Sequence, residues 1–281
     1  MPQVAGFSLS GRIRVIRSRQ NPGVQAFREI ARKRKPSHDR VLLDGWHLLI
    51  EARQAGVPIE RAAFTTDLVN QRDTARVAQD LIDSGVDVIA VTTAVMEALS
   101  PVRAPSGVVA IGTHKAVTPD AVFARAPQLV LLAVDVQDPG NVGAMVRAAE
   151  AAGATGFIAC GASADPFGWK ALRGSMGSAF RLPVARAAVD AALRAARAAR
   201  VHVLAAVPRV GQPLFEADLR RPTAFMLGGE GSGLPLDLLQ QADGTLTIPM
   251  RAPVESLNVA VAAALLLYEA ARQRAKAGFG L

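Results

Sequence analysis

Short apolar runs alternate with helix-like segments over two separate stretches of the chain. In the first stretch, residues 18–112, this alternation is typical of a small α/β unit. The strands that it predicts cover residues 41–44, 61–66, 87–92 and 107–112. The helices that it predicts cover residues 24–35, 46–56, 74–85 and 94–100. We therefore expect a small domain of α/β/α type in this part of the chain.

The second alternation fills residues 129–281, and its strands are continuous apolar runs. Such runs are typical of a parallel sheet that helices cover on both faces. The predicted strands cover residues 128–135, 156–161, 201–208, 223–227 and 245–249. The predicted helices cover residues 141–153, 169–180, 189–200, 234–242 and a long segment from Ser256 to about Lys276. The fold class that we expect is α/β, with a larger parallel-sheet domain following the smaller one.

Two further segments separate these domains from each other and from the start of the chain. Residues 113–128 contain two prolines and have no strong period, so we expect a linker there. Residues 1–17 are predicted to be a basic N-terminal tail. Residues 1–50 contain ten Lys and Arg but only three Asp and Glu, so most of the net charge of +8 lies in the N-terminal part of the chain. This distribution favours an anionic partner, such as nucleic acid, for the first domain.

Several classes of protein lose support from what the sequence lacks. The single cysteine, Cys160, makes an intrachain disulfide impossible, and the four histidines do not have the spacing of metal ligands, so no metal is expected. The longest apolar run, Val259 to Tyr268, is far below the roughly 18 residues that span a bilayer. Neither a dinucleotide fingerprint nor a GxxxxGK phosphate loop occurs. We expect a cytoplasmic protein without a membrane partner.

Three predicted strands of the second domain end in loops with unusual chemistry. These loops read QDPGNVG, GGEGSG and MRAPVESLN. Ligands of open parallel sheets bind beyond the carboxyl ends of strands, so we expect the loops to converge on one pocket. In the first loop, Asp138 suits a helix N-cap and Pro139 the first helical position. Arg147 follows Gly143 by one turn, and from spacing alone it is either a solvated side chain or a functional one.

The other two loops also allow a plain structural interpretation. The four glycines around Glu230 either form a flexible turn or let a ligand approach bare backbone. Ser256 either caps the last helix, with Asn258 in its first turn, or belongs to a site. The helix that follows is apolar nearly all round, which predicts deep burial and suggests a subunit interface.

Taken together, these segments resemble a known family. DPGNVGAMVRAAEAAGATGF, LGGEGSGLP and IPMRAPVESLNVAVAAALLLYEA are similar, in order and spacing, to the three signature motifs of the SpoU/TrmH family of RNA ribose 2'-O-methyltransferases, within the SPOUT superfamily. SRQNPGVQAFREI and LLDGWHLLIEA resemble the ribosomal-protein-like RNA-binding module often fused ahead of this catalytic domain. The resemblance implies a C-terminal trefoil knot, S-adenosylmethionine as cofactor, and a homodimer formed through the catalytic domain and the C-terminal helix, with catalytic groups contributed across the interface.

The resemblance also implies roles for individual residues. The expected catalytic residues are Arg147, Asn141, Glu230, Ser256 and Asn258. The expected cofactor-binding residues are Gly228, Ile248, Met250 and Leu257. The expected RNA-binding residues are Arg17, Arg19, Arg28, Arg32, Lys33, Arg34, Lys35, Lys170 and Arg173. A solvated surface is the alternative for these cations. The chain departs from many relatives after IPM, where Arg251, Ala252 and Pro253 replace a usual glycine, so the shape of that turn is open.

The function predicted is S-adenosylmethionine-dependent methylation of an RNA ribose 2'-hydroxyl. The two-domain layout favours ribosomal RNA over transfer RNA as the substrate. Base methylation and a non-catalytic RNA-binding or ribosome-assembly role on the same fold are the alternatives. A guanidinium is a poor base near neutral pH, so our hypothesis for Arg147 is that it orients the hydroxyl and the adjacent phosphate and stabilises developing negative charge. The group that accepts the proton, either water or another residue, is left open.

Overall fold

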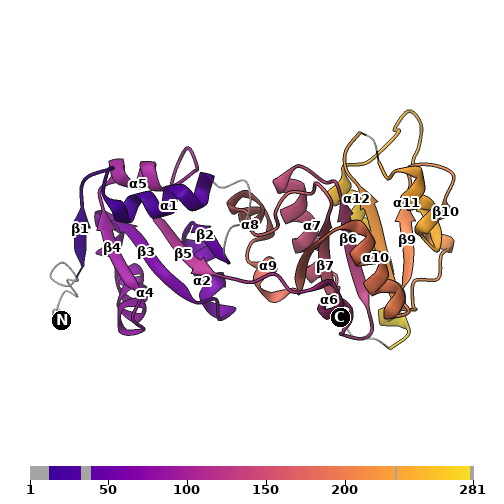
Figure 1. Cartoon of the computed structure of the whole chain (residues 1–281), viewed down its shortest axis with the longest axis horizontal. Helices are drawn as coiled ribbons and strands as arrows, with labels where there is room; N and C mark the ends of the chain where they lie inside the picture. Colours follow the sequence, from indigo (N-terminus) through magenta and orange to yellow (C-terminus); the bar gives the residue numbers. More distant parts are fainter. Residues whose placement is uncertain (1–12, 33–38, 232, 279–281) are drawn as a thin grey trace, which may run out of the picture. The chain divides into compact units, whose positions relative to one another are not determined.

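The chain folds into two compact units, residues 1–115 and 116–281, which we describe one at a time (Figure 1). The structure is a computed structural model, and it describes residues 13–32, 39–231 and 233–278. Among these residues, no helix has the length and apolar character needed to cross a bilayer.

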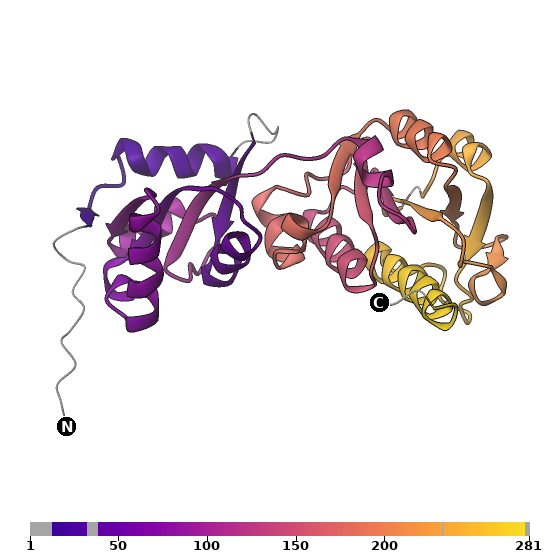
Figure 2. The ribbon, with the colours of Figure 1, turned by 90° about the horizontal axis from the view of Figure 1, so that it is seen from below.

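The first unit is a five-stranded mixed sheet with helices on both faces. The sheet order is β1-β4-β3-β5-β2, and β5 runs antiparallel to its neighbours β3 and β2. The strands are β1 (Arg14–Ile16), β2 (Arg40–Asp44), β3 (Ile59–Thr65), β4 (Asp87–Val91) and β5 (Val108–Thr113). The helices are α1 (Pro22–Arg32), α2 (Trp46–Gln54), α3 (Thr66–Val69), α4 (Arg72–Asp83) and α5 (Thr93–Leu99). Figure 2 shows α1 on one side of the sheet and α4 on the other, so this unit has three layers.

Two segments differ from the boundaries expected from the sequence. Residues 14–16 form β1 and pair in parallel with β4, so part of the expected tail belongs to the sheet. The expected linker contains helix α6 (Pro119–Phe123), in which Thr118 accepts a hydrogen bond from the Ala121 amide. Val122 and Phe123 of α6 are buried in the core of the second unit. Thr-Pro is a helix start as well as a loop signal, because proline suits the first helical position.

The second unit is built on a seven-stranded sheet in which every neighbouring pair is parallel, as the continuous apolar runs predicted. Its order is β10-β12-β9-β11-β6-β7-β8. The strands are β6 (Leu129–Val134), β7 (Gly156–Cys160), β8 (Val184–Ala187), β9 (His202–Ala206), β10 (Gln212–Pro213), β11 (Thr223–Gly228) and β12 (Gly244–Thr247). β8 and β10 were not expected, since both are short edge strands that carry polar or charged residues.

Helices cover both faces of this sheet (Figure 2). α7 and α12 pack against each other on one face, while α6, α10 and α11 contribute to the core on the other. The remaining elements of the second unit are α7 (Pro139–Ala151), α8 (Trp169–Ser175), α9 (Ser178–Arg181), α10 (Val189–Ala198), the 3-10 helix η1 (Leu214–Glu216), α11 (Leu236–Gln241) and α12 (Val259–Lys276).

Two helix predictions need correction. The single helix expected over residues 169–180 is interrupted at Met176 and Gly177, whose φ angles of 52° and 87° are left-handed and end α8 before α9 begins. The last helix begins at Val259 rather than Ser256. Its N-cap is Asn258, whose side-chain oxygen accepts hydrogen bonds from the amides of Ala260 and Val261. Asn258 is therefore not in the first turn.

His202, at the start of β9, is expected to make the stability of the second unit depend on pH. Its Nε2 lies 2.8 Å from Nη2 of Arg221, and its Nδ1 is buried without a hydrogen-bond partner among the described residues. Burial, and then the charge of Arg221, lower the pKa of His202, while Asp243 partly opposes this shift. A lowered pKa in the folded state means that the stabilisation is present above about pH 6.5 and is lost as pH falls through the folded value.

We expect the free energy of unfolding to fall as pH is lowered from 7 to 5, and to fall less in His202→Gln, because glutamine does not titrate. Denaturant unfolding at several pH values measures both slopes. The difference between the two slopes is the contribution of His202. It excludes the contributions of other titrating groups such as His114, because burial lowers the pKa of His114 in both proteins. Equal slopes would exclude His202 as a source of acid sensitivity.

Candidate functional site

Loops from the carboxyl ends of β9, β11 and β12 enclose a pocket of about 260 Å³. Its walls contain all four residues that we expected to bind a cofactor, namely Gly228, Ile248, Met250 and Leu257. Glu230 and Ser256 also line it. The β9 loop, which contributes Ala206, Val207 and Pro208, was not expected there. No polar motif marks that loop, and its place in the wall follows from strand order, which places β9 between β11 and β12.

The glycine-rich loop after β11 packs backbone against backbone. A Cβ atom on Gly229 would collide with the carbonyl oxygen of Asp135, the residue that follows β6. A Cβ on Gly228 would collide with the backbone of Gly233, and Gly229 pairs with Gly233 as an isolated bridge. Side chains at these positions would push the loop away from Asp135 or distort it at Gly233, because the colliding atoms are backbone, which cannot rotate aside as a flexible side chain can. The loop therefore presents bare backbone to the pocket.

A hydrogen-bonded cluster joins the three loops that the sequence singled out. Nδ2 of Asn141 donates to Oε1 of Glu230 at 2.7 Å. Nδ2 of Asn258 donates to the same Glu230 oxygen at 3.1 Å and to Oδ1 of Asn141 at 3.0 Å. We call these three residues the Asn–Glu–Asn cluster. It connects the segments that follow β6, β11 and β12. Its two asparagines are 117 residues apart in the sequence.

Helix capping fixes the orientation of both asparagines in the cluster. Oδ1 of Asn258 accepts from the amides of Ala260 and Val261 at 3.0 and 3.3 Å, so its NH₂ group must face Glu230 and Asn141. Asp138 caps α7 as predicted, and its Oδ1 accepts from the amide of Asn141 at 2.8 Å. A cluster whose members are held by helix ends is pre-organised, which is what a site needs for positioning a reacting group.

Arg147 lies apart from this cluster. It is exposed on α7, six residues beyond Asn141, which corresponds to about 9 Å along a helix axis. It does not line the pocket, and among the described residues its guanidinium makes no hydrogen bond or ion pair. The structure thus brings together four of the five expected catalytic residues, through the cluster and the pocket wall, and leaves Arg147 outside them.

The expected RNA-binding residues fall in both units. In the first unit, Arg17 and Arg19 follow β1, and Arg19 donates to the carbonyl of Ala94 at 2.9 Å and pairs with Glu97 at 3.5 Å. Arg28 and Arg32 lie on α1. In the second unit, Lys170 and Arg173 are exposed on α8, and Lys170 Nζ lies 5.4 Å from the ring centroid of Trp169. Lys33, Arg34 and Lys35 are outside the described residues.

The described residues contain no cluster of His, Cys, Asp and Glu that would hold a metal ion. Cys160 is buried at the end of β7, where burial and the charge of Asp135 raise its thiol pKa to about 12. A thiol with so high a pKa is a poor nucleophile. The polar side chains of the pocket wall and the Asn–Glu–Asn cluster are two amides, the carboxylate of Glu230 and the hydroxyl of Ser256.

Comparisons with known proteins agree with this geometry. Residues 128–268 match the SpoU rRNA Methylase family, and residues 21–110 match the MRM3-like substrate binding domain. An uncharacterised tRNA/rRNA methyltransferase of Synechocystis is 33% identical over 95% of this chain and 97% of its own length. The 23S rRNA (guanosine(2553)-2'-O)-methyltransferase RlmP of Bacillus subtilis is 31% identical over 90% of this chain and 97% of its own length.

Among solved structures, the AdoMet-bound rRNA methyltransferase from Sinorhizobium meliloti has a TM-score of 0.82 and 29% identity. The match covers 93% of this chain and 98% of that one, so it includes both units. The matched residues of the SpoU model contain the whole Asn–Glu–Asn cluster and the residues expected to bind the cofactor. The chain belongs to the SpoU rRNA methylase family.

Proposed function

We propose that this protein transfers a methyl group from S-adenosylmethionine to a ribose 2'-hydroxyl of RNA, with ribosomal RNA as the substrate. The observation that carries the proposal is the Asn–Glu–Asn cluster beside the pocket, because it unites the three motifs of a methyltransferase family in one site. The relative RlmP is named for 2'-O-methylation of guanosine in 23S rRNA, which favours ribose over base and ribosomal over transfer RNA.

The pocket fits S-adenosylmethionine. Its volume is close to the lower end of the roughly 300–1,000 Å³ that is usual for small-ligand sites. Leu227, Ile248 and Leu257 supply apolar walls for an aromatic base, and the glycine-rich loop offers unobstructed backbone donors and acceptors. When bound, S-adenosylmethionine supplies an electrophilic methyl group. Isothermal titration calorimetry tests this fit, and we expect one molecule bound per subunit. Absence of binding would favour the non-catalytic RNA-binding alternative.

The residues of the chain supply orientation and charge stabilisation. The Asn–Glu–Asn cluster holds the loops around the pocket in one arrangement. Arg147 orients the 2'-hydroxyl and the adjacent phosphate by its planar fork of donors and stabilises negative charge that develops on the oxygen. A guanidinium stays protonated near neutral pH, so Arg147 is not the base.

Arg147 reaches the site in a homodimer that forms through α12. Val261, Leu265 and Tyr268 form an apolar stripe on α12 at helical spacing, and they are 50%, 43% and 52% exposed. Tyrosine and leucine in such a stripe suit a subunit interface. The dimer explains why Arg147 is exposed on α7, the helix that α12 packs against, and makes no hydrogen bond or ion pair with the described residues of its own chain. A two-fold axis at the apolar stripe of α12 places Arg147 of each subunit beside the pocket of its partner.

A C-terminal trefoil knot is the expected form of the chain around the pocket. Its support is the path from β12, which lies near one edge of the sheet, back to α12, which packs against α7 and contacts β11. The two domains have separate roles in this proposal. Residues 18–112 bind RNA, and residues 129–281 catalyse the methyl transfer, in the cytoplasm.

RNA binding through the first domain predicts a steep dependence on salt. Each phosphate neutralised by a Lys or Arg contributes about 0.7 to 0.9 to the slope of log K against log salt concentration. We expect Arg28→Gln combined with Arg32→Gln to lower this slope by about 1.4 to 1.8, since each substitution removes about one phosphate contact. Filter binding of ribosomal RNA fragments from low to high salt measures it. Arg194→Gln, an exposed position on α10 of the second unit, is the control. If the affinity of the wild type for RNA did not change with salt concentration, RNA binding through the cations of this domain would be contradicted.

A further inference from the structure

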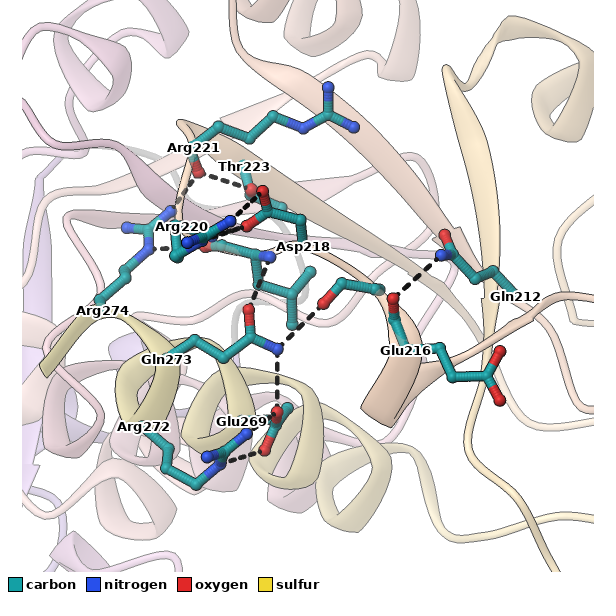
Figure 3. Close-up of polar contacts among 12 residues, drawn as sticks. Gln212, Glu216, Asp218, Arg220, Arg221, Thr223, Glu269, Arg272, Gln273 and Arg274 are labelled. Atoms are coloured by element: carbon teal, nitrogen blue, oxygen red, sulfur yellow. Dashed lines mark hydrogen bonds and ion pairs between the residues drawn. The ribbon is translucent and has the colours of Figure 1, made fainter. Parts of the chain in front are cut away.

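A buried arginine anchors the far end of α12. Arg274 is only 5% exposed, and its guanidinium faces backbone carbonyls rather than a carboxylate. Its Nη2 donates to the carbonyl oxygen of Arg221 at 2.7 Å (Figure 3). Its Nε donates to that of Leu219 at 3.0 Å, and Nη2 also donates to that of Gln128 at 2.9 Å. Burial lowers the pKa of Arg274. A buried cation needs its donors satisfied, so these carbonyls fix where the side chain lies.

The residues around Arg274 strengthen the same attachment. Oε1 of Gln273 accepts from the amide of Leu219, and its Nε2 donates to the carbonyl of Ala217, both at 2.9 Å. Gln273 also donates to Glu269, which is held by Arg272 through two hydrogen bonds. Figure 3 shows Gln273 and Arg274 directed from α12 towards the loop before β11, and Arg272 bonded to Glu269 along the helix.

The carbonyls that Arg274 binds lie just before the two strands whose other ends lead to the candidate site. Gln128 immediately precedes β6, and Leu219 and Arg221 lie four and two residues before β11. Beyond the other ends of these strands, the first turn of α7 carries Asn141 and the loop after β11 carries Glu230, and both bond to Asn258 at the start of α12. α12 is therefore bonded at both ends to segments that flank the same pair of neighbouring strands, β6 and β11.

Between these two ends, the buried side chains of α12 make no hydrogen bond to another element among the described residues. They are Val259, Ala263, Leu266, Leu267, Glu269, Ala270 and Ala271, and Glu269 bonds only to Arg272 and Gln273 of its own helix. Close apolar packing restricts the helix by shape, whereas the hydrogen bonds at its two ends also specify which polar atoms meet. A shift by one residue moves a helix by about 1.5 Å, whereas a functional group must be placed within about 0.5 Å.

We infer that Arg274 is a positioning residue for the methyl-transfer site, and that it sets the axial position of α12 so that Asn258 meets Glu230 and Asn141. The inference rests on the proposed function for its effect on turnover, but not for its effect on Asn258. Arg274 does not line the pocket. It affects the site indirectly, because the position of α12 determines where Asn258 lies at the other end of the helix.

Arg274→Lys tests this role, because lysine keeps the charge but cannot bond three carbonyls with a planar fork. Arg272→Lys is the matched control, since Arg272 is exposed at the same end of α12 and, among the described residues, bonds only Glu269 of its own helix. The side-chain NH₂ signals of Asn258 in a ¹⁵N NMR spectrum, identified by their loss in Asn258→Asp, report its hydrogen bonds without any need for turnover. We expect these signals to shift in Arg274→Lys and to stay unchanged in Arg272→Lys.

The same variants are then compared as enzymes. We expect Arg274→Lys to lower kcat by about 100-fold, the cost of a displacement of roughly 1 Å, while KM for RNA is unchanged. If Arg274→Lys does not fold, Gln273→Met, which removes bonds to the same loop, takes its place. Wild-type Asn258 signals in a folded variant would overturn the inference. If no protein, including the wild type, methylates RNA, the proposed function fails while the Asn258 signals still decide the role of Arg274.

Discussion

Replacing Arg147 by alanine is expected to lower kcat by about 100- to 1,000-fold, the effect of losing one donor to charge that develops in a transition state. The dissociation constant for S-adenosylmethionine should stay unchanged, because Arg147 does not line the pocket. Single-turnover methylation and calorimetry measure the two quantities. Arg147→Lys is expected to remain strongly impaired, since a point charge does not replace the bidentate fork. Substantial turnover in Arg147→Lys with a shifted pH profile would contradict the orienting role.

A mixing experiment shows whether Arg147 acts in its own subunit or in the partner's. Arg147→Ala and Glu230→Ala are each expected to be nearly inactive. When they are mixed and allowed to exchange subunits, half of the dimers carry one of each, and one of their two sites has an intact pocket facing an intact Arg147. Activity should return to about one quarter of the wild type. A mixture as inactive as its components would place Arg147 in the site of its own chain.

Replacing Gly143 by alanine is expected to have the largest effect on stability. A Cβ there would collide with the carbonyl oxygen of Ala171 and lie 3.0 Å from the backbone of both Gly174 and Ser175. All three neighbours are backbone of α8, so α7 and α8 must separate. We expect a loss of about 3 kcal/mol in the free energy of unfolding, the upper part of the range for overpacking.

Because α7 carries Asn141, the separation should also weaken binding of S-adenosylmethionine. Denaturant unfolding and calorimetry measure the two effects. Ala144→Ser is the control, since Ala144 is the next residue of α7 and its side chain is exposed. If Gly143→Ala is as stable as the control variant, the close packing of α7 and α8 is not required.

Local signals in the sequence predicted much of the second unit. The run VLLAVD predicted β6, and the pair Asp138 and Pro139 predicted the start of α7, because both depend on residues within one turn of each other. β8 escaped prediction because Arg186 interrupts a run of only four residues at the sheet edge. Ser256 was a candidate cap of the last helix, with Asn258 in its first turn, whereas Asn258 is the cap and also bonds Glu230 and Asn141, which lie far away in the sequence.

In the candidate site too, local sequence signals predicted some features, whereas others depend on contacts between distant parts of the sequence. Sequence motifs identified the members of the Asn–Glu–Asn cluster, and the parallel sheet predicted that their loops meet at one edge. The order of the strands, which puts the β9 loop in the pocket wall, arises from tertiary packing and has no local signal. The anchoring of Arg274 was equally hidden, since an arginine near a helix C-terminus usually indicates a solvated side chain that interacts with the helix dipole.

The central claim is that this protein methylates the ribose 2'-oxygen of ribosomal RNA. The most direct test uses ribosomal RNA from cells that lack the protein, incubated with purified protein and S-adenosylmethionine that carries an isotope-labelled methyl group. The RNA is digested to nucleosides, which are separated and identified by mass spectrometry. The account predicts that the label appears in a 2'-O-methylnucleoside, at a position that is methylated in cells containing the protein. Label in a methylated base, or no label in any nucleoside, would contradict it.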